Sequence, residues 1–327
     1  MANIDKELLK ILIDQEDELD FELEKLRKKF GREIRRQGSK INDESKIQKL
    51  TPVLIAGFIA SLTNLLSKTN VGASEAIGKR DIGVLSKLMK GIKDPQANIL
   101  LKTFEKEVRA YTSQVHKTIF TRKVFKNRTL SSRILSLKSG STKTVRNIIH
   151  IGVSEGKSTI EIARQVEQYI KPKGKLLRVS PWKWYKERFP SYRVSDLKNI
   201  PPGSVSYNSF MIARTETAFT YRNTTVELNK NEPWAKGFIW NLSASHPVFD
   251  ICDDWAAGSP YKAGNLPDGH PNGLCHVTTA IASKKEMRRY IKGGKVPKKI
   301  KGKPAITQKQ FAKKHKKKKT KEVKKII

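Results

Sequence analysis

Apolar residues recur every three or four positions through the first part of the chain, which is the period of one face of an α-helix. The pattern is clearest between residues 8 and 30, and a second helical stretch begins at Asp94-Pro95, a capping residue followed by proline. We therefore expect a helical N-terminal domain over residues 1–128. The apolar positions of its first helix are Leu8, Leu12, Leu19, Leu23, Leu26 and Phe30.

Residues 50–67 carry no charge, which raises the question of a membrane span. Thr51-Pro52 has the form of an N-cap followed by proline at the first helical position, and the stretch also contains Thr63 and Asn64. A span needs about 20 predominantly apolar residues. We expect instead a buried helix of about four turns that begins at Thr51, and no contact with a membrane.

A second module is expected to begin near Thr129. A Gly156-Lys157 turn separates two helical patterns, and Ser158 with Glu161 forms the Ser-x-x-Glu capping box that starts a helix. The Gly-Lys-Ser sequence is not a phosphate-binding loop, because Ile151 stands where that signature requires glycine. A further helix is predicted over 208–229.

Two later segments alternate between apolar and polar residues, which is the period of a β-strand. The first places Phe238 and Trp240 on one face, and the second places Cys275 and Val277 on one face. Antiparallel pairing is the simplest arrangement of two such strands. Residues 129–283 are therefore predicted to form a small α+β module with a strand pair and a long loop, and the whole chain is predicted to be α+β but mainly α.

The connection between these strands gathers the side chains that most often bind metals. It spans residues 245–276 and contains both cysteines and three of the six histidines. Loops without internal structure rarely exceed about 12–15 residues, so this one needs internal order, a cross-link or a role. The residues concerned are His246, Asp250, Cys252, His270, Cys275 and His276.

Three structures would explain this clustering, and the spacing leaves all three open. A tetrahedral zinc site would use both cysteines and two of His246, His270, His276 and Asp250. A Cys252–Cys275 disulfide would close a loop of about 24 residues. A reduced loop would be held by proline turns and by Asp250 and Asp253, with backbone amides as donors. In each case the loop is a structural element rather than a reaction centre.

The helix over 208–229 carries two further charged candidates. Arg214 and Glu216 are two positions apart, so they point to different sides of the helix and are poorly placed to act on one substrate atom. We expect them to hold adjacent segments by charged hydrogen bonds. Arg222 lies two turns after Arg214, with Ala218 between them, which leaves room for an acidic partner or a loop carbonyl.

The net charge of +35 is unevenly distributed. Residues 284–327 hold 20 Lys and Arg against two acidic residues, and so contribute +18 of it. Such a segment has little to bury, so we expect it to be disordered when free and to bind nucleic acid, although a merely solubilising tail would look the same. The predicted DNA contacts are Lys298, Lys299, Lys313, Lys314, Lys316, Lys317, Lys318 and Lys319.

Four segments follow one another in order between residues 129 and 283: GVSEGKSTIEIAR, MIARTETAFTYRN, WNLSASHPVFDICD and LPDGHPNGLCHV. In combination they resemble the Mu F-like head-morphogenesis family, the minor capsid proteins of tailed bacteriophages. Members of that family commonly carry Cys-x-x-Cys in the loop and Cys-x-Cys after His-Pro. Trp255 and Gly273 replace one cysteine of each pair here, which excludes a four-cysteine zinc site.

The resemblance implies a late virion protein, without established catalytic activity, that lies inside the head near the portal and assists head assembly and DNA packaging or delivery. The expected partners are double-stranded DNA bound without sequence preference, the portal protein, and a major capsid or scaffolding protein. The expected location is the capsid interior, with the host cytoplasm during assembly. The alternatives are a metal-dependent nuclease or hydrolase that uses the loop, and a chromatin-like DNA binder. A structural zinc is the one cofactor considered.

Overall fold

The computed structural model describes residues 2–41, 43–122, 128–171, 178–179, 194–195, 203–243, 250–270, 273–307 and 309–314. The fold is mainly α-helical with a small antiparallel sheet, as the sequence predicts. The chain divides into two compact units: unit 1 is Met1–Gly72 with Val115–Thr217, and unit 2 is Ala73–Gln114 with Ala218–Ile327.

This division differs from the domains expected over 1–128, 129–283 and 284–327. The boundary after residue 128 falls within unit 1, and the boundary after residue 283 falls within unit 2. The physical reason is the extent of the unit 1 core, which joins apolar side chains from both sides of residue 128. Each unit is therefore built from two separate stretches of the chain, and no single boundary in the sequence divides one unit from the other.

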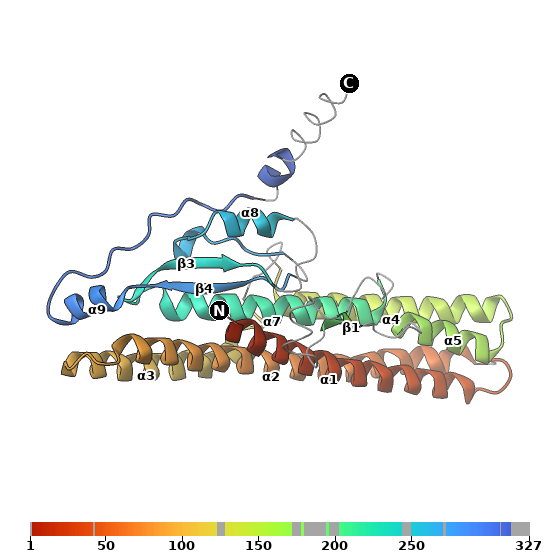
Figure 1. Ribbon diagram of the computed structural model, residues 1–327. Coiled ribbons are helices and arrows are strands. Elements are labelled where there is room, and N and C mark those ends of the chain that lie inside the picture. The colour runs from red at the N-terminus through yellow and green to blue at the C-terminus, as the bar shows by residue number, and fades with distance from the viewer. Residues whose placement is uncertain are drawn as a thin grey trace, which may run out of the picture. The chain divides into compact units, whose positions relative to one another are not determined.

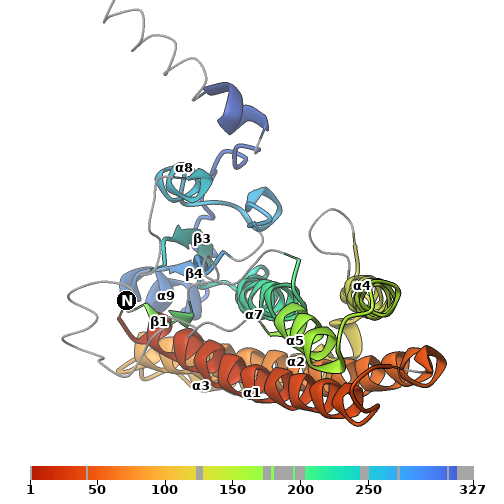
Figure 2. The same cartoon turned by 90° about the vertical axis from the view of Figure 1, so that its right-hand side faces the viewer.

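Unit 1 is built from long helices that share one apolar core. Its helices are α1 (Ala2–Arg35), the first part of α2 (Glu44–Met89), α4 (Leu130–Ser154), α5 (Thr159–Ile170) and the first part of α7 (Val205–Asn229). Figure 2 shows α5 between α1 and α4, and its buried face supplies Ile162, Val166 and Ile170 to the core. All six predicted apolar positions of α1 are buried.

The prediction of a short helix that starts at Thr51 is wrong. α2 begins at Glu44 and runs through Pro52. Proline lacks the N–H that would bond to the carbonyl four residues earlier, which belongs to Gln48. Arg146 of α4 supplies the missing donors, with Nε and Nη2 at 3.2 and 3.0 Å from the Gln48 oxygen. The helix therefore continues, because a side chain from another helix satisfies the orphaned carbonyl.

α2 is long and apolar enough to cross a membrane by length and composition alone. Core helices of soluble proteins meet the same criterion, and Ile55, Phe58, Leu62 and Leu66 of α2 are buried in the unit 1 core. Its polar side chains bond to backbone carbonyls one turn back, as Thr69 Oγ1 does to Leu65 O at 2.7 Å. The absence of a membrane contact stays a prediction.

The turn between α4 and α5 follows the sequence closely. Gly156 has a φ of +68°, a left-handed conformation that glycine adopts at little cost. The Ser158–Glu161 capping box is confirmed: Ser158 Oγ accepts from the Glu161 amide, and Glu161 Oε2 accepts from the Ser158 amide at 2.9 Å. Local sequence therefore fixes where α5 begins.

Unit 2 contains the antiparallel sheet of β3 (Ala235–Asn241) and β4 (His276–Ile281), as predicted. It also holds the rest of α2 and α7, nearly all of α3 (Pro95–Thr118), and α8 (Ile251–Ala257), η3 (Ala263–Asn265) and α9 (Lys284–Ile291). In Figure 1, α8 lies along β3. Trp240 pairs with Val277 in the sheet, and both side chains are buried. A second, two-residue pair, of β1 (Arg178–Val179) with β2 (Val194–Ser195), belongs to unit 1.

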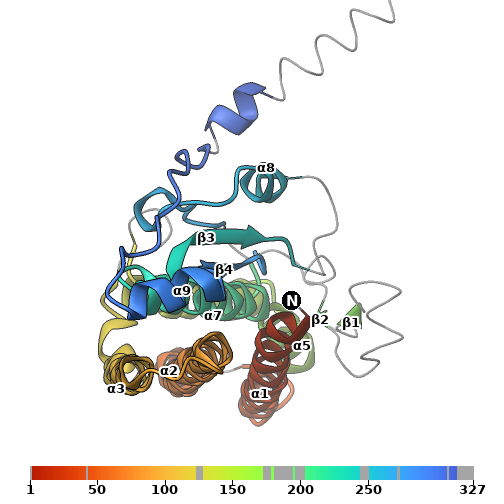
Figure 3. The ribbon, with the colours of Figure 1, turned by 60° about the vertical axis from the view of Figure 1, so that its left-hand side comes forward.

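The prediction that residues 284–327 are disordered is wrong for their first part. Residues 284–291 form α9, residues 292–307 run past β3 as irregular chain, and residues 309–314 are helical (Figure 3). Ile300 N donates to Lys236 O at 2.7 Å, and Trp255 Nε1 donates to Ile306 O at 2.8 Å. Ile306 and Phe311 also pack on the unit 2 core. Residues 315–327 lie outside the described part.

Two glycines of α4 give a matched test of the packing. A Cβ on Gly152 would lie 2.6 Å from Cγ1 of the buried Ile162, whereas a Cβ on exposed Gly140 would meet nothing within 4 Å. Gly152→Ala should lower the free energy of unfolding by about 1–3 kcal/mol through overpacking. Gly140→Ala should raise it by about 1 kcal/mol through helix propensity. Urea unfolding of both variants checks the opposite signs; equal effects would contradict the α4–α5 packing.

Candidate functional site

The long connection between β3 and β4 has internal structure. Asp250 caps α8, since its Oδ1 accepts from Cys252 N at 2.6 Å, and Asp253 Oδ2 accepts from Asp250 N at 2.8 Å. Both aspartates therefore bond to backbone amides, as the reduced-loop interpretation expects. Tyr261 then exchanges backbone hydrogen bonds with Phe238 of β3, at 2.7 and 2.8 Å. Helix capping and this bridge give the loop the order that its length requires.

The two cysteines lie side by side in the unit 2 core. Cys252 is fully buried and Cys275 is 2% exposed, and both are free thiols in this structure. A hydrogen bond between the thiols, together with burial, raises the pKa of Cys252 well above its ordinary range. Two cysteines that are 23 positions apart in sequence therefore pack in the same core cluster. This arrangement is compatible with all three interpretations of the loop.

Asp250, Cys252 and His270 converge on one point. Their potential ligand atoms all lie within 4.8 Å of one another. Asp250 Oδ2 is 3.5 Å from His270 Nε2, and the His270 ring lies 6.4 Å from that of Trp255. The carboxylate and the imidazole are partly exposed, whereas the thiols are buried. The cluster therefore has one polar side that is open to solvent.

His276 does not belong to this cluster, so the prediction that it is a candidate ligand is wrong. It follows Cys275 directly, and the alternation of β4 turns its side chain the other way. Its ring instead makes an edge contact with Tyr221, with centroids 6.5 Å apart. Burial, with the positive charges of Arg80 and Arg222, lowers the pKa of His276 to about 4. His246 lies outside the described residues.

Arg222 holds the end of the loop. Its Nη1 donates to Cys275 O at 3.0 Å, which is the loop carbonyl that the sequence left open as a partner. The guanidinium lies over the Trp240 ring at 5.5 Å. Gly269, with φ of +79°, passes so close that a Cβ there would be 2.6 Å from Arg222 Nη2. The arginine therefore bonds to one end of the segment that carries His270 and packs against the other.

Arg214 and Glu216 each pair with a different helix of unit 1. Arg214 Nε and Nη2 both lie 2.5 Å from Glu16 Oε1 of α1. Glu216 is fully buried and forms an ion pair with Arg133 of α4. These contacts are the charged hydrogen bonds between segments that the two-residue spacing predicts. Sequence reasoning did not identify Glu16 and Arg133 as partners, because nothing local marks residues so distant in the chain.

The basic segment, residues 284–314, presents its cations to solvent. All thirteen of its Lys and Arg are exposed, and it contains one acidic residue, Glu286, which pairs with Lys236 at 2.9 Å. One of these thirteen side chains, Lys314, forms an ion pair with Asp254 at 2.8 Å. Lys299 Nζ donates to Glu232 O at 2.6 Å, so it anchors the segment.

Of the predicted DNA contacts, the structure places four on the basic segment: Lys298, Lys299, Lys313 and Lys314. Lys316, Lys317, Lys318 and Lys319 lie outside the described residues. Lys292, Lys295, Lys301 and Lys303 were not singled out from the sequence, although they share the same exposed run. The sequence did contain a signal that was not used. The run includes a few apolar residues, Ile300, Ile306 and Phe311, and such residues indicate a segment that packs on a folded surface.

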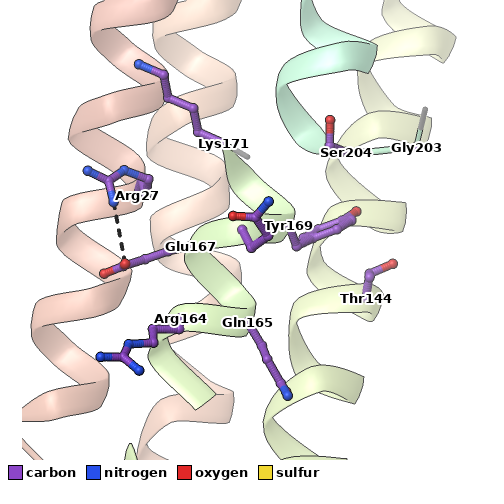
Figure 4. A pocket seen from close by; sticks show the side chains of 10 residues that line it. Arg27, Thr144, Arg164, Gln165, Glu167, Tyr169, Lys171, Gly203 and Ser204 are labelled. Carbon is purple, nitrogen blue, oxygen red and sulfur yellow. Dashed lines mark hydrogen bonds and ion pairs between the residues drawn. The ribbon is translucent and has the colours of Figure 1, made fainter. Parts of the chain in front are cut away.

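A hollow in unit 1 has a volume of about 840 Å³. Figure 4 shows Arg27 and Glu167 paired at its wall, at 3.4 Å, and Arg35 adds a second pair to Glu167 at 2.6 Å. Its rim includes Lys171 and Gly203, which flank a stretch of which only β1 and β2 are described. We therefore assign no function to it.

Comparison of the chain with protein-family models, with curated proteins and with solved structures gives no match. The resemblance to the Mu F-like family accordingly rests on the sequence motifs alone.

The Arg214–Glu16 pair predicts a large effect on stability. Arg214→Ala removes the guanidinium from the buried Glu16 carboxylate and should lower the free energy of unfolding by about 3–5 kcal/mol. Arg214→Met combined with Glu16→Leu should recover most of that loss. Arg36→Ala removes an exposed pair with Glu33 and should change stability by about 0–1 kcal/mol. Chemical denaturation of the three variants measures whether their losses of stability follow this order. Unchanged stability in Arg214→Ala would contradict a structural role for Arg214.

Glu232 predicts a specific pH dependence. Burial and the neighbouring carboxyl of Glu107 raise the pKa of Glu232 from 4.5 to about 7. The unfolded chain therefore releases this proton first, and the free energy of unfolding falls as pH rises from about 4.5 to 7. Glu232→Gln should abolish this part of the decline, so the variant should gain stability over wild type at pH 8 but not at pH 4. Exposed Glu227→Gln is the control; parallel pH profiles for all three proteins would refute the shift.

Proposed function

We propose that this chain is a non-enzymatic structural protein that binds double-stranded DNA without sequence preference through the basic segment. The observation that carries this proposal is the exposure of all thirteen cations of residues 284–314, with one acidic residue among them. Lys and Arg side chains neutralise phosphates and release condensed counterions, and this term is the main source of sequence-independent affinity.

The way the segment is held favours backbone contact over base recognition. Hydrogen bonds to Lys236, Asn265 and Trp255 fix the backbone of residues 300–306 against unit 2. Lysines at 295, 298, 301 and 303 extend from this fixed chain into solvent. Between residues 292 and 307 the basic segment offers phosphate partners along an irregular chain, whereas base readout usually places a helix or a β-ribbon in the major groove.

The biological setting follows from the motif resemblance. We propose a minor capsid protein of a tailed bacteriophage that lies inside the head near the portal, contacts the portal protein and a major capsid or scaffolding protein, and assists head assembly and DNA packaging or delivery. A protein between a shell and packaged DNA needs a folded body for protein contacts and cations for DNA. The helical body of unit 1 and the basic segment of unit 2 meet these two needs.

A metal-dependent nuclease or hydrolase is the second candidate, favoured by the convergence of Asp250, Cys252 and His270. Catalytic metal sites keep an open coordination position for water or substrate. Two buried thiols in contact leave less room for such a position than carboxylates and imidazoles alone would. Plasmid cleavage with added Mg²⁺, Mn²⁺ or Zn²⁺ tests this candidate; we expect no cleavage, and cleavage that His270→Ala abolishes would establish the enzyme instead.

Neutralising part of the basic segment should weaken DNA binding. The variant replaces Lys295, Lys298, Lys301 and Lys303 with Gln. The slope of log K against log salt should become shallower by up to about 0.9 for each phosphate that the variant no longer neutralises. This variant tests the charges alone. Deletion of residues 284–327 would also remove Ile306 and Phe311, which pack on the unit 2 core, and so could change the fold. Fluorescence anisotropy with duplexes of unrelated sequence gives both affinity and slope.

The matched control replaces four exposed lysines of unit 1, Lys29, Lys46, Lys49 and Lys143, with Gln. It has the same net charge as the test variant and should bind DNA nearly as well as wild type. Equal losses in the two variants would show that overall charge, rather than the basic segment, determines binding. Strong dependence on duplex sequence would contradict the absence of base recognition.

A further inference from the structure

The loop cluster of unit 2 is not used by the proposed DNA contacts, yet the side chains of three potential metal ligands converge there. Asp250, Cys252 and His270 place their ligand atoms within 4.8 Å of one another. The buried Cys275 belongs to the same core cluster as Cys252. We propose that Asp250, Cys252, His270 and Cys275 form a closed tetrahedral site for a zinc-class divalent cation.

The separations fit such an ion. Oxygen and nitrogen ligands about 2.0–2.1 Å from a tetrahedral zinc are about 3.3 Å apart, and two thiolates at about 2.3 Å are about 3.8 Å apart. Asp250 Oδ2 and His270 Nε2 are 3.5 Å apart, and the ligand atoms of Asp250, Cys252 and His270 all lie within 4.8 Å of one another. Asp250, Cys252 and His270 already converge, whereas Cys275 is not among the converging residues, so its buried thiol would have to turn toward them to supply the fourth bond.

The backbone around the cluster holds the ligands in place. Asp250 Oδ1 accepts from Cys252 N, so the carboxylate is oriented by the cap while Oδ2 faces His270. Cys252 lies in the first turn of α8, and Cys275 immediately precedes β4. The His270 ring lies against the Gly273 backbone, where a Cβ would be 2.9 Å from its Cε1. Three segments thus meet at one point, and a bound ion would join them.

The chemistry of the donors selects the ion. Two thiolates and an imidazole favour zinc or cobalt over Mg²⁺ and Ca²⁺, which prefer oxygen ligands. On binding, each thiol releases its proton to solvent as its sulfur–metal bond forms. With the Asp250 carboxylate the complex carries one net negative charge, and the Arg222 guanidinium is bonded to the Cys275 carbonyl beside it. Four protein ligands make the ion structural rather than catalytic.

The test uses the full-length chain purified without chelator. Elemental analysis should give one zinc per chain. After chelation, titration with Co²⁺ should produce a thiolate-to-cobalt charge-transfer band and intense visible bands of tetrahedral cobalt that saturate at one equivalent. Zn²⁺ should abolish them. Added Zn²⁺ should also raise the melting temperature of the stripped protein, because it binds the folded state.

Variants separate the ligands from their neighbours. Cys252→Ser and His270→Ala should lose the bound zinc and the tetrahedral cobalt spectrum. His270→Cys should keep one cobalt and strengthen the charge-transfer band, which guards against loss of binding through misfolding. His150→Ala, an exposed histidine of α4, should behave as wild type.

Four results would overturn the proposal. They are a wild-type protein with free thiols but neither bound zinc nor cobalt bands, a Cys252–Cys275 disulfide in protein kept with Zn²⁺, full metal binding by Cys252→Ser, and DNA cleavage that requires the bound metal. The last would mean that the coordination shell is open.

Discussion

Helix α7 is buried on almost every side although many of its residues are polar, and this constraint shapes both units. A buried polar group without a partner costs free energy, and an unpaired charge costs several kcal/mol. Within unit 1, α7 therefore requires Glu16 and Gln15 of α1 and Arg133 of α4 as partners. Within unit 2, Thr224 bonds to Ser74 and Asn229 bonds to Asp81. The neighbouring helices are held in register by these specific pairs as well as by apolar packing.

The same requirement explains where sequence reasoning succeeded. Features that depend on near neighbours could be predicted: the apolar face of α1, the Ser158–Glu161 capping box, the Asp250 and Asp253 contacts, and the antiparallel β3–β4 pair. Each results from a short-range rule of backbone geometry or hydrogen bonding. The two-residue spacing of Arg214 and Glu216 likewise indicated different partners without revealing which ones.

Features that depend on distant residues could not be predicted. Thr51-Pro52 was expected to start a helix, but α2 already runs through Pro52, where Arg146, 94 positions later, bonds to the Gln48 carbonyl. The basic segment looked unable to fold because its apolar residues are few, yet Ile306 and Phe311 have a prepared surface on unit 2. For His276 a signal was present: neighbours in a strand face opposite ways, so His276 and Cys275 had no reason to share a metal. That His270 is the histidine that converges with Asp250 and Cys252 could be seen only in the structure.

Neither unit is a continuous stretch of chain. Unit 1 needs residues as far as Thr217, and unit 2 combines Ala73–Gln114 with everything after Ala218. During synthesis, the last part of α2 and most of α3 emerge more than 100 residues before the segments that complete their unit. Their apolar faces have no partner from the rest of unit 2 until the chain beyond Ala218 has been synthesised. No single cut produces either unit intact, so a protease or a cloning boundary that falls between residues 73 and 217 separates residues that belong together.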